Sequence, residues 1–134
     1  TQSIKGINGP VVIEGNEITG NWKMYKIPMS EMPNVDALPS ANTKGMPTLY
    51  AGTFNLDTTG DTFLNMETWG KGIVFVNGFN LGRYWKRGPQ QTLYLPGCLL
   101  KKGENKIVVF EQQNDNQQTS INGQTTPILD KLMQ

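Results

Sequence analysis

The chain has 134 residues, with twelve lysines and arginines, eleven aspartates and glutamates and no histidine, so its formal net charge is +1. This length is typical of one domain, and it suffices for a hydrophobic core without disulfides or metal ions. The balanced charge excludes a broad basic face and argues against nucleic acid as a partner. Without histidine, the chain lacks the commonest general base and the commonest metal ligand.

The composition favours short strands over long helices. Fifteen glycines and eight prolines accompany a hydrophobic fraction of only 37%, which suits strands joined by tight turns. No apolar run is long enough to span a membrane, and no signal peptide begins at Thr1. Because the sequence starts on Thr rather than Met, we expect an excised segment. The single cysteine, Cys98, lies among leucines and prolines, and we predict that it is a small buried core residue.

The first 47 residues predict two short strands followed by a loop. The apolar run at residues 11–13 is the first strand, and the loose alternation over residues 22–29 indicates the second. Pro28 suggests that this strand either ends there or lies at a sheet edge. Residues 30–47 are punctuated by prolines, and we expect a loop that either holds one helical turn or crosses between sheets.

Residues 48–112 predict the core. The apolar run at residues 72–77 is typical of a central strand, and Asn77–Gly78 predicts a type I′ turn because both residues tolerate positive φ. We expect one helical turn at residues 98–101, a polar loop at 113–123 and a last edge strand within 126–132. Seven or eight strands at this spacing predict an all-β antiparallel sandwich or barrel. The remaining predicted strands cover residues 49–56, 62–67, 79–85, 91–95 and 106–112.

Five ordered segments carry a family resemblance: residues 61–64 (DTFL), 69–72 (WGKG), 76–85 (VNGFNLGRYW), 88–96 (GPQQTLYLP) and 102–111 (KGENKIVVFE). Together they resemble the C-terminal jelly-roll domain, of galactose-binding-like type, of glycoside hydrolase family 35 β-galactosidases. Residues 4–30 are similar to the preceding segment of that family more loosely. The resemblance therefore predicts residues 1–45 as lead-in strands and loop of the same sandwich, and 46–134 as a jelly-roll core with a polar tail from about residue 113.

The resemblance also implies a parent enzyme. Its N-terminal (β/α)₈ barrel would remove terminal β-linked galactose with retention, using two glutamates with carboxyl groups about 5–5.5 Å apart. Nothing in this chain matches those motifs, and no alternating βα pattern is present. We therefore predict that the chain alone is non-catalytic and that its partner is the barrel of the same parent. By the same resemblance, the parent is expected to be bacterial and periplasmic or secreted.

Trp69, Tyr84 and Trp85 are candidates for an aromatic platform, because sugar rings present apolar C–H faces to aromatic rings. The favoured interpretation is that the tryptophans pack in the core or against the barrel, and contact with galactosides is the alternative. Polar candidates for the same sugar-binding or domain-interface surface are Asn80, Arg83, Gln90 and Gln91.

The charged residues suggest contacts rather than chemistry. Arg83 lies inside a predicted strand, and we expect it to pair with Asp61 or Glu67. A basic cluster is expected to form a solvated rim or a domain contact, and it comprises Lys71, Arg83, Lys86 and Arg87. The spacing of Asp57, Asp61 and Glu67 matches no calcium-loop template, so neither a metal nor a cofactor is predicted.

These observations predict an accessory domain that packs on the barrel, orders neighbouring loops and shapes the approach to the galactose pocket. Two alternatives stay open. One is a carbohydrate-binding module for galactose-containing glycans, and the other is a protein-interaction domain from an unrelated multidomain protein.

Overall fold

The computed structural model describes residues 6–40, 44–113 and 120–129, and the structural statements below concern these ranges. All strand pairs in them are antiparallel, and the helical content is one short 3-10 turn. The elements are β1 (Val12–Ile13), β2 (Asn16–Glu17), β3 (Thr48–Leu56), β4 (Thr62–Asn65), β5 (Lys71–Val76), β6 (Phe79–Trp85), β7 (Thr92–Leu95), η1 (Gly97–Leu99), β8 (Gly103–Glu111) and β9 (Asn122–Gln124).

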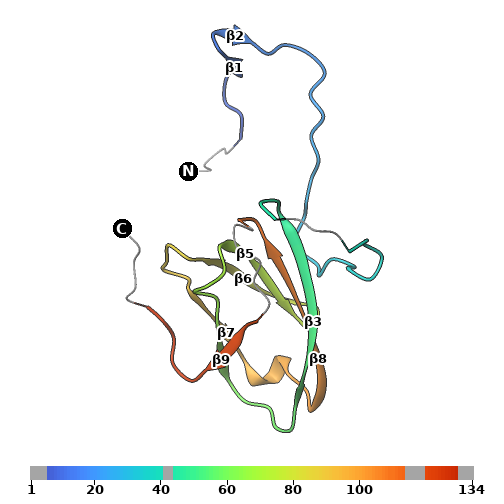
Figure 1. Ribbon diagram of the computed structural model, residues 1–134, viewed down its shortest axis with the longest axis vertical. Helices are drawn as coiled ribbons and strands as arrows, with labels where there is room; N and C mark the ends of the chain where they lie inside the picture. The colour runs from blue at the N-terminus through green and yellow to red at the C-terminus, as the bar shows by residue number, and fades with distance from the viewer. Residues whose placement is uncertain (1–5, 41–43, 114–119, 130–134) are drawn as a thin grey trace.

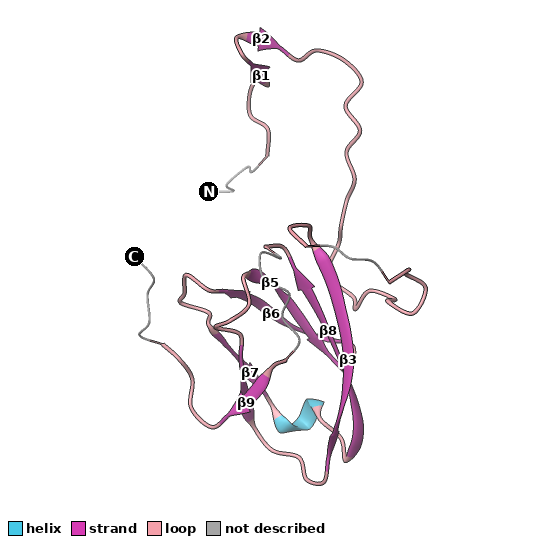
Figure 2. Ribbon diagram, viewed as in Figure 1, coloured by secondary structure: helices cyan, strands magenta, loops and turns pink. Residues whose placement is uncertain are grey.

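Two sheets form a sandwich (Figure 1). The larger sheet has the order β3-β8-β5-β6, and the smaller has the order β7-β4-β9 (Figure 2). The strands pack their inward-facing residues into one core, as expected for alternating side chains. This architecture confirms the predicted all-β antiparallel sandwich and is consistent with a jelly roll. The core cluster comprises Leu64, Met66, Trp69, Val74, Val76, Tyr84, Leu93, Leu95 and Val109.

β5 is the central strand that the sequence predicts. It pairs with β6 on one side and β8 on the other. The turn to β6 has φ of +50° at Asn77 and +89° at Gly78, which confirms the predicted pair of positive angles.

The loop of residues 29–40 lies over the outer face of the larger sheet. Phe75 and Val108 are fully buried, yet they lie outside the core cluster, because they point away from the smaller sheet. Two bonds hold the loop there: Asn80 Nδ2 donates to the Met29 carbonyl over 2.6 Å, and Lys106 Nζ lies 3.0 Å from Asp36 Oδ2. The loop therefore serves as a cover, with a bond from Leu38 N to Val35 O inside it.

An asparagine clamp fixes the start of β8. Asn105 is fully buried, and its Oδ1 accepts hydrogen bonds from Asn77 Nδ2 at 2.8 Å and Lys101 N at 3.0 Å. Its Nδ2 donates to the carbonyls of Lys101 and Gly103. All the bonding groups of this amide are satisfied, which makes a buried polar residue tolerable.

Three expectations need correction. Cys98 is exposed rather than buried, because it sits on η1 while the neighbouring Leu99 and Leu100 pack against the core. Residues 22–29 form no strand, since no described segment pairs with them. The last described strand is β9, which begins within the segment predicted as a polar loop and ends one residue beyond it. Residues 126–129 form no strand, and 130–132 lie outside the described residues.

The described residues contain no helix of the length and hydropathy that a membrane crossing requires.

Candidate functional site

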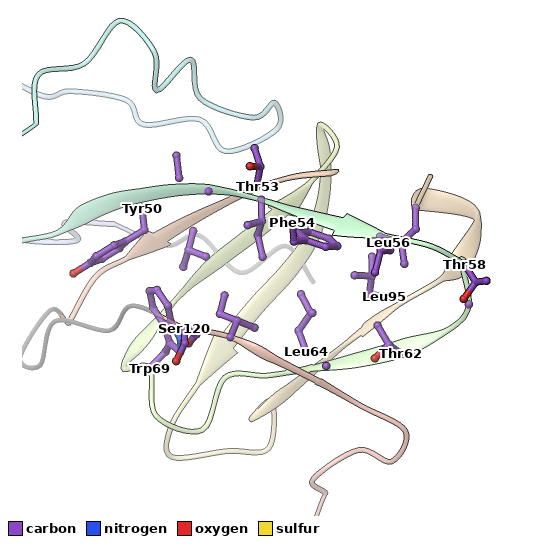
Figure 3. Close-up of a pocket in the computed structure, with 18 residues that line it drawn as sticks. Tyr50, Thr53, Phe54, Leu56, Thr58, Thr62, Leu64, Trp69, Leu95 and Ser120 are labelled. Atoms are coloured by element: carbon purple, nitrogen blue, oxygen red, sulfur yellow. The ribbon is translucent and has the colours of Figure 1, made fainter. Parts of the chain in front are cut away.

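A cavity of about 560 Å³ opens between the two sheets beneath β3 (Figure 3). Aliphatic and aromatic side chains make most of its wall, with the hydroxyl groups of Thr58 and Thr62 in the loop after β3 and at the start of β4. Thr53 also lines the cavity, but its side chain points to the opposite face of β3 (Figure 3). None of the described lining residues is an aspartate, glutamate, lysine, arginine or cysteine. The cavity can therefore accept apolar surface and a few hydroxyl groups, but its wall offers no carboxylate for proton transfer.

An aromatic group closes one end of the cavity. The rings of Tyr50 and Trp69 meet edge to face, with centroids 5.2 Å apart, and Trp69 meets Tyr84 in the same way at 6.5 Å. Trp69 is only 3% exposed, and its Nε1 donates to the Ser120 carbonyl at 3.1 Å. Because this indole is packed and hydrogen-bonded, it acts as core rather than as an open platform.

Behind the aromatic group lies a buried carboxylate. Glu111 is 2% exposed, and both of its oxygens are occupied. Oε2 accepts from Gly70 N at 2.7 Å and from the Tyr84 hydroxyl at 3.2 Å. Oε1 accepts from Lys71 N at 3.0 Å and from Gln113 N at 2.7 Å. Burial, and then the charge and hydrogen bond of Glu111, raise the pKa of Tyr84 far above its ordinary value, so this phenol stays a donor.

A second carboxylate braces the rim of the sandwich. Asp61 Oδ2 accepts from the Tyr94 hydroxyl at 2.6 Å, and its Oδ1 accepts from Gly97 N at 2.8 Å. The bond from Gly97, followed by that from Tyr94, lowers the pKa of Asp61, and the bond to Asp61 raises the pKa of Tyr94. This pair joins β7 to the loop before β4, so Asp61 serves a structural contact and is not the expected partner of Arg83.

Residues 47–105 match the family model for the galactose-binding domain of β-galactosidases. The similarity supports a galactose-binding domain of a β-galactosidase.

Three relatives extend the similarity beyond the matched residues. The chain is 39% identical over 115 residues to Beta-galactosidase 1 of Dictyostelium discoideum, a match covering 80% of this chain and 17% of that protein. It is 39% identical over 116 residues to human Beta-galactosidase-1-like protein 2, covering 81% and 18%. It is 38% identical over 138 residues to Beta-galactosidase 17 of Arabidopsis thaliana, covering 87% and 20%. The chain thus spans about a fifth of the length of the curated relatives it matches, and their eukaryotic sources give no support to a bacterial parent.

The structure separates the three predicted platform residues. Trp69 and Tyr84 lie in the core, whereas Trp85 follows Tyr84 on β6 and points to the opposite face of the sheet. There, Lys71 Nζ lies 5.2 Å from the centroid of the Trp85 ring, and the Arg83 guanidinium carbon lies 5.7 Å from it. Lys71, Arg83 and Trp85 therefore form a cation–π group on the outer face of the larger sheet.

The polar residues predicted for the same surface also lie in different parts of the domain. Asn80 holds Met29 through Nδ2 and accepts from Gly82 N through Oδ1. Gln91 is 2% exposed and donates to the Lys86 carbonyl at 2.8 Å, which braces the turn between β6 and β7. Gln90 Oε1 accepts from Arg83 Nη2 at 3.4 Å, so only Gln90 joins the outer group.

Glu111 is the site residue that sequence reasoning undervalued. The alternation of residues 106–112 places Glu111 on the same side as Ile107 and Val109, both of which pack toward the core. A carboxylate continuing an inward-facing apolar series is the signal that identifies a buried, hydrogen-bonded acid.

The described ranges hold no group of three or more histidine, cysteine, aspartate or glutamate residues able to share an ion.

Proposed function

We propose that this chain is a non-catalytic accessory domain of an exo-acting, retaining β-galactosidase of family 35 type. In that parent it follows the catalytic (β/α)₈ barrel, packs on it and shapes the approach to the galactose pocket. The observation that carries the proposal is the cavity wall, which offers only apolar groups and hydroxyls. Retaining glycoside hydrolysis needs a nucleophilic carboxylate beside a second acid, and none of the described residues that line the cavity can supply either.

The buried acid supports the same conclusion. Glu111 accepts bonds from three backbone amides and one phenol, so its oxygens are committed to holding β5, β6 and β8 together. A catalytic acid must instead reach a substrate oxygen. The β-galactosidases that this chain matches are about five times longer than it. A parent of that length has enough additional sequence to form a barrel.

A hydrolysis assay tests the proposal. The full-length parent should release nitrophenol from a nitrophenyl β-galactoside, and the 134-residue chain at equal molarity should release none above the uncatalysed background. Turnover by the chain that disappears in a Glu111→Gln variant would overturn the non-catalytic role. A full-length parent without β-galactosidase activity would overturn the assignment to this enzyme class.

Galactoside binding is a second candidate, because the outer group of Lys71, Arg83 and Trp85 combines a partly exposed indole with hydrogen-bond donors. Gln90 adds an amide beside it. Titration calorimetry of the chain with galactose and with galactan fragments decides this point. Heat that is lost in Trp85→Ala but retained in Phe63→Ala supports binding at this face, whereas a flat titration removes the candidate.

A further inference from the structure

An arm of residues 6–28 extends away from the sandwich (Figure 1). Within it, β1 and β2 pair only with each other among the described strands, and residues 20–28 form no strand. Eight of its large hydrophobic side chains are between 40% and 86% exposed: Ile7, Val12, Ile13, Ile18, Trp22, Met24, Tyr25 and Ile27. Soluble domains seldom present so many apolar side chains on one segment unless another surface covers them.

The sequence of the arm is typical of a strand that lacks its sheet. Trp22 and Met24 alternate with Lys23 and Tyr25, so an extended backbone directs apolar groups to both of its sides. In the structure, Met24 is 86% exposed and Tyr25 is 81% exposed. The strand that the pattern predicts is therefore missing a neighbour to pair with, and the described part of this chain supplies none.

The base of the arm is fixed on the sandwich. Asn80 Nδ2 donates to the Met29 carbonyl at 2.6 Å, and the ion pair between Lys106 and Asp36 secures the loop that follows. Met29 is also partly buried, in contrast to residues 20–28. The arm consequently leaves the sandwich from one anchored point. This anchoring would hold the arm near a fixed position on a neighbouring domain.

The relatives indicate which neighbour this is. The family model matches residues 47–105, whereas the match to the Arabidopsis relative covers 87% of the chain, too much to stop short of the arm. The arm thus accompanies the sandwich in proteins of which the chain represents only about a fifth. A covering surface for the arm would lie in the sequence that these relatives have in addition.

We propose that residues 21–28 add as a strand to an exposed sheet edge of another domain in the same parent protein, with Trp22, Met24, Tyr25 and Ile27 buried against apolar side chains there. Backbone hydrogen bonds to that edge would supply the pairing that this chain lacks, and the alternating side chains would fix the register. This inference rests on the proposed function, in that it requires a multidomain parent.

Trypsin provides the test, because Lys23 and Lys26 lie within the arm. We compare cleavage after these lysines, followed by mass spectrometry, in the 134-residue chain and in the full-length parent. A docked strand should be cleaved about 100-fold more slowly in the parent than in the chain, because cleavage requires local opening. Met24→Asp and Tyr25→Asp in the parent should restore rapid cleavage. The matched control is Phe79→Asp, which alters an exposed aromatic residue on β6 and should leave the arm protected.

Each other outcome counts against the inference. Equal cleavage in the chain and the wild-type parent overturns it, and so does a Phe79→Asp parent that is cleaved as fast as the Met24→Asp parent. A dimer of the 134-residue chain in light scattering that Tyr25→Asp dissociates would make a second copy the partner and would also overturn it. The nitrophenyl galactoside assay stays independent: an active parent with an unprotected arm removes this inference and leaves the proposed function intact.

Discussion

The hydroxyl of Tyr84 donates a 3.2 Å hydrogen bond to Oε2 of Glu111 across the intervening strand β5. The residue between them is Gly72, which pairs with Tyr84 on β6 and with Glu111 on β8. Because glycine has no side chain, the phenol of Tyr84 can lie over the β5 backbone and reach the carboxylate. The hydrogen bond between Tyr84 and Glu111 thus links β6 to β8 across β5, and it is possible because Gly72 has no side chain.

Glu111→Gln should lower the free energy of unfolding by about 2–4 kcal/mol, because an amide places donor hydrogens toward backbone N–H groups that need an acceptor. Chemical unfolding monitored by tryptophan fluorescence measures the change. Glu104→Gln, at an exposed position on the same strand, is the matched control and should change stability by no more than about 0.5 kcal/mol. Equal stability of the two variants would show that the hydrogen bonds to Glu111 contribute little.

Tyr84→Phe should cost about 1–2 kcal/mol at neutral pH and should flatten the loss of stability in alkali. Burial and Glu111 raise the pKa of Tyr84 in the folded state, so above about pH 10 the unfolded chain loses this proton first. The stability from this group is therefore complete below about pH 10 and declines as the pH rises, by up to about 1.4 kcal/mol per unit.

Urea unfolding at several alkaline pH values measures that decline. Wild type should lose more stability than Tyr84→Phe over the same interval. Tyr25→Phe, at an 81% exposed position in the arm, is the control and should follow wild type. Parallel curves for wild type and Tyr84→Phe would contradict the assignment of the alkaline loss to Tyr84.

Much of the sandwich could be predicted because its signals are local. The apolar run of β5 and the Asn77–Gly78 turn each determine backbone geometry over a few residues, and both predictions are confirmed. The separation of Trp69 from Trp85 depends instead on the assembled fold: Trp69, between β4 and β5, packs in the core, whereas Trp85 lies on the outer face of β6. Successive side chains of a strand point to opposite faces of the sheet. Tyr84 therefore packs in the core, while its neighbour Trp85 lies on the outer face.

Longer-range relationships account for the remaining differences. β9 is short and polar, and it forms because residues 122–124 pair with β4, nearly sixty residues earlier in the chain. Cys98 resembles its apolar neighbours in sequence, but η1 turns it outward while Leu99 packs inward. The pairing partner of one segment and the side of a turn that faces the core are properties of the assembled fold, which local patterns do not encode.

Gly72→Ala should destabilise the domain by more than about 3 kcal/mol, since the added methyl group would collide with the Phe110 carbonyl and the Tyr84 hydroxyl. Gly52→Ala is the matched control on the edge strand β3. There a Cβ would lie 3.9 Å from Ile107 Cγ2, an ordinary contact, and alanine should stabilise by about 0.5 kcal/mol. Thermal and urea unfolding measure both variants. A Gly72→Ala protein as stable as wild type would show that Tyr84 can reach Glu111 by another path.

Asp61→Asn should move the pKa of Tyr94 down toward its ordinary value, because the bond to the Asp61 carboxylate, which is the largest cause of the upward shift, loses its charge. The same contact also affects stability at acidic pH. The pKa of Asp61 is lowered in the folded state, so the stability that this group contributes is present above about pH 4 and is lost as the pH falls through the folded-state pKa.

Titration of the Tyr94 ring carbon by nuclear magnetic resonance reports the first effect without depending on stability. Asp57→Asn provides the comparison, because Asp57 lies in the same loop and Asp61 alone accepts the bond from Tyr94. We expect the Tyr94 pKa to fall in Asp61→Asn and to stay at its wild-type value in Asp57→Asn. If Tyr94 titrates identically in all three proteins, the 2.6 Å contact does not hold the rim in solution, and the Asp61 carboxylate would be bound by Gly97 N alone.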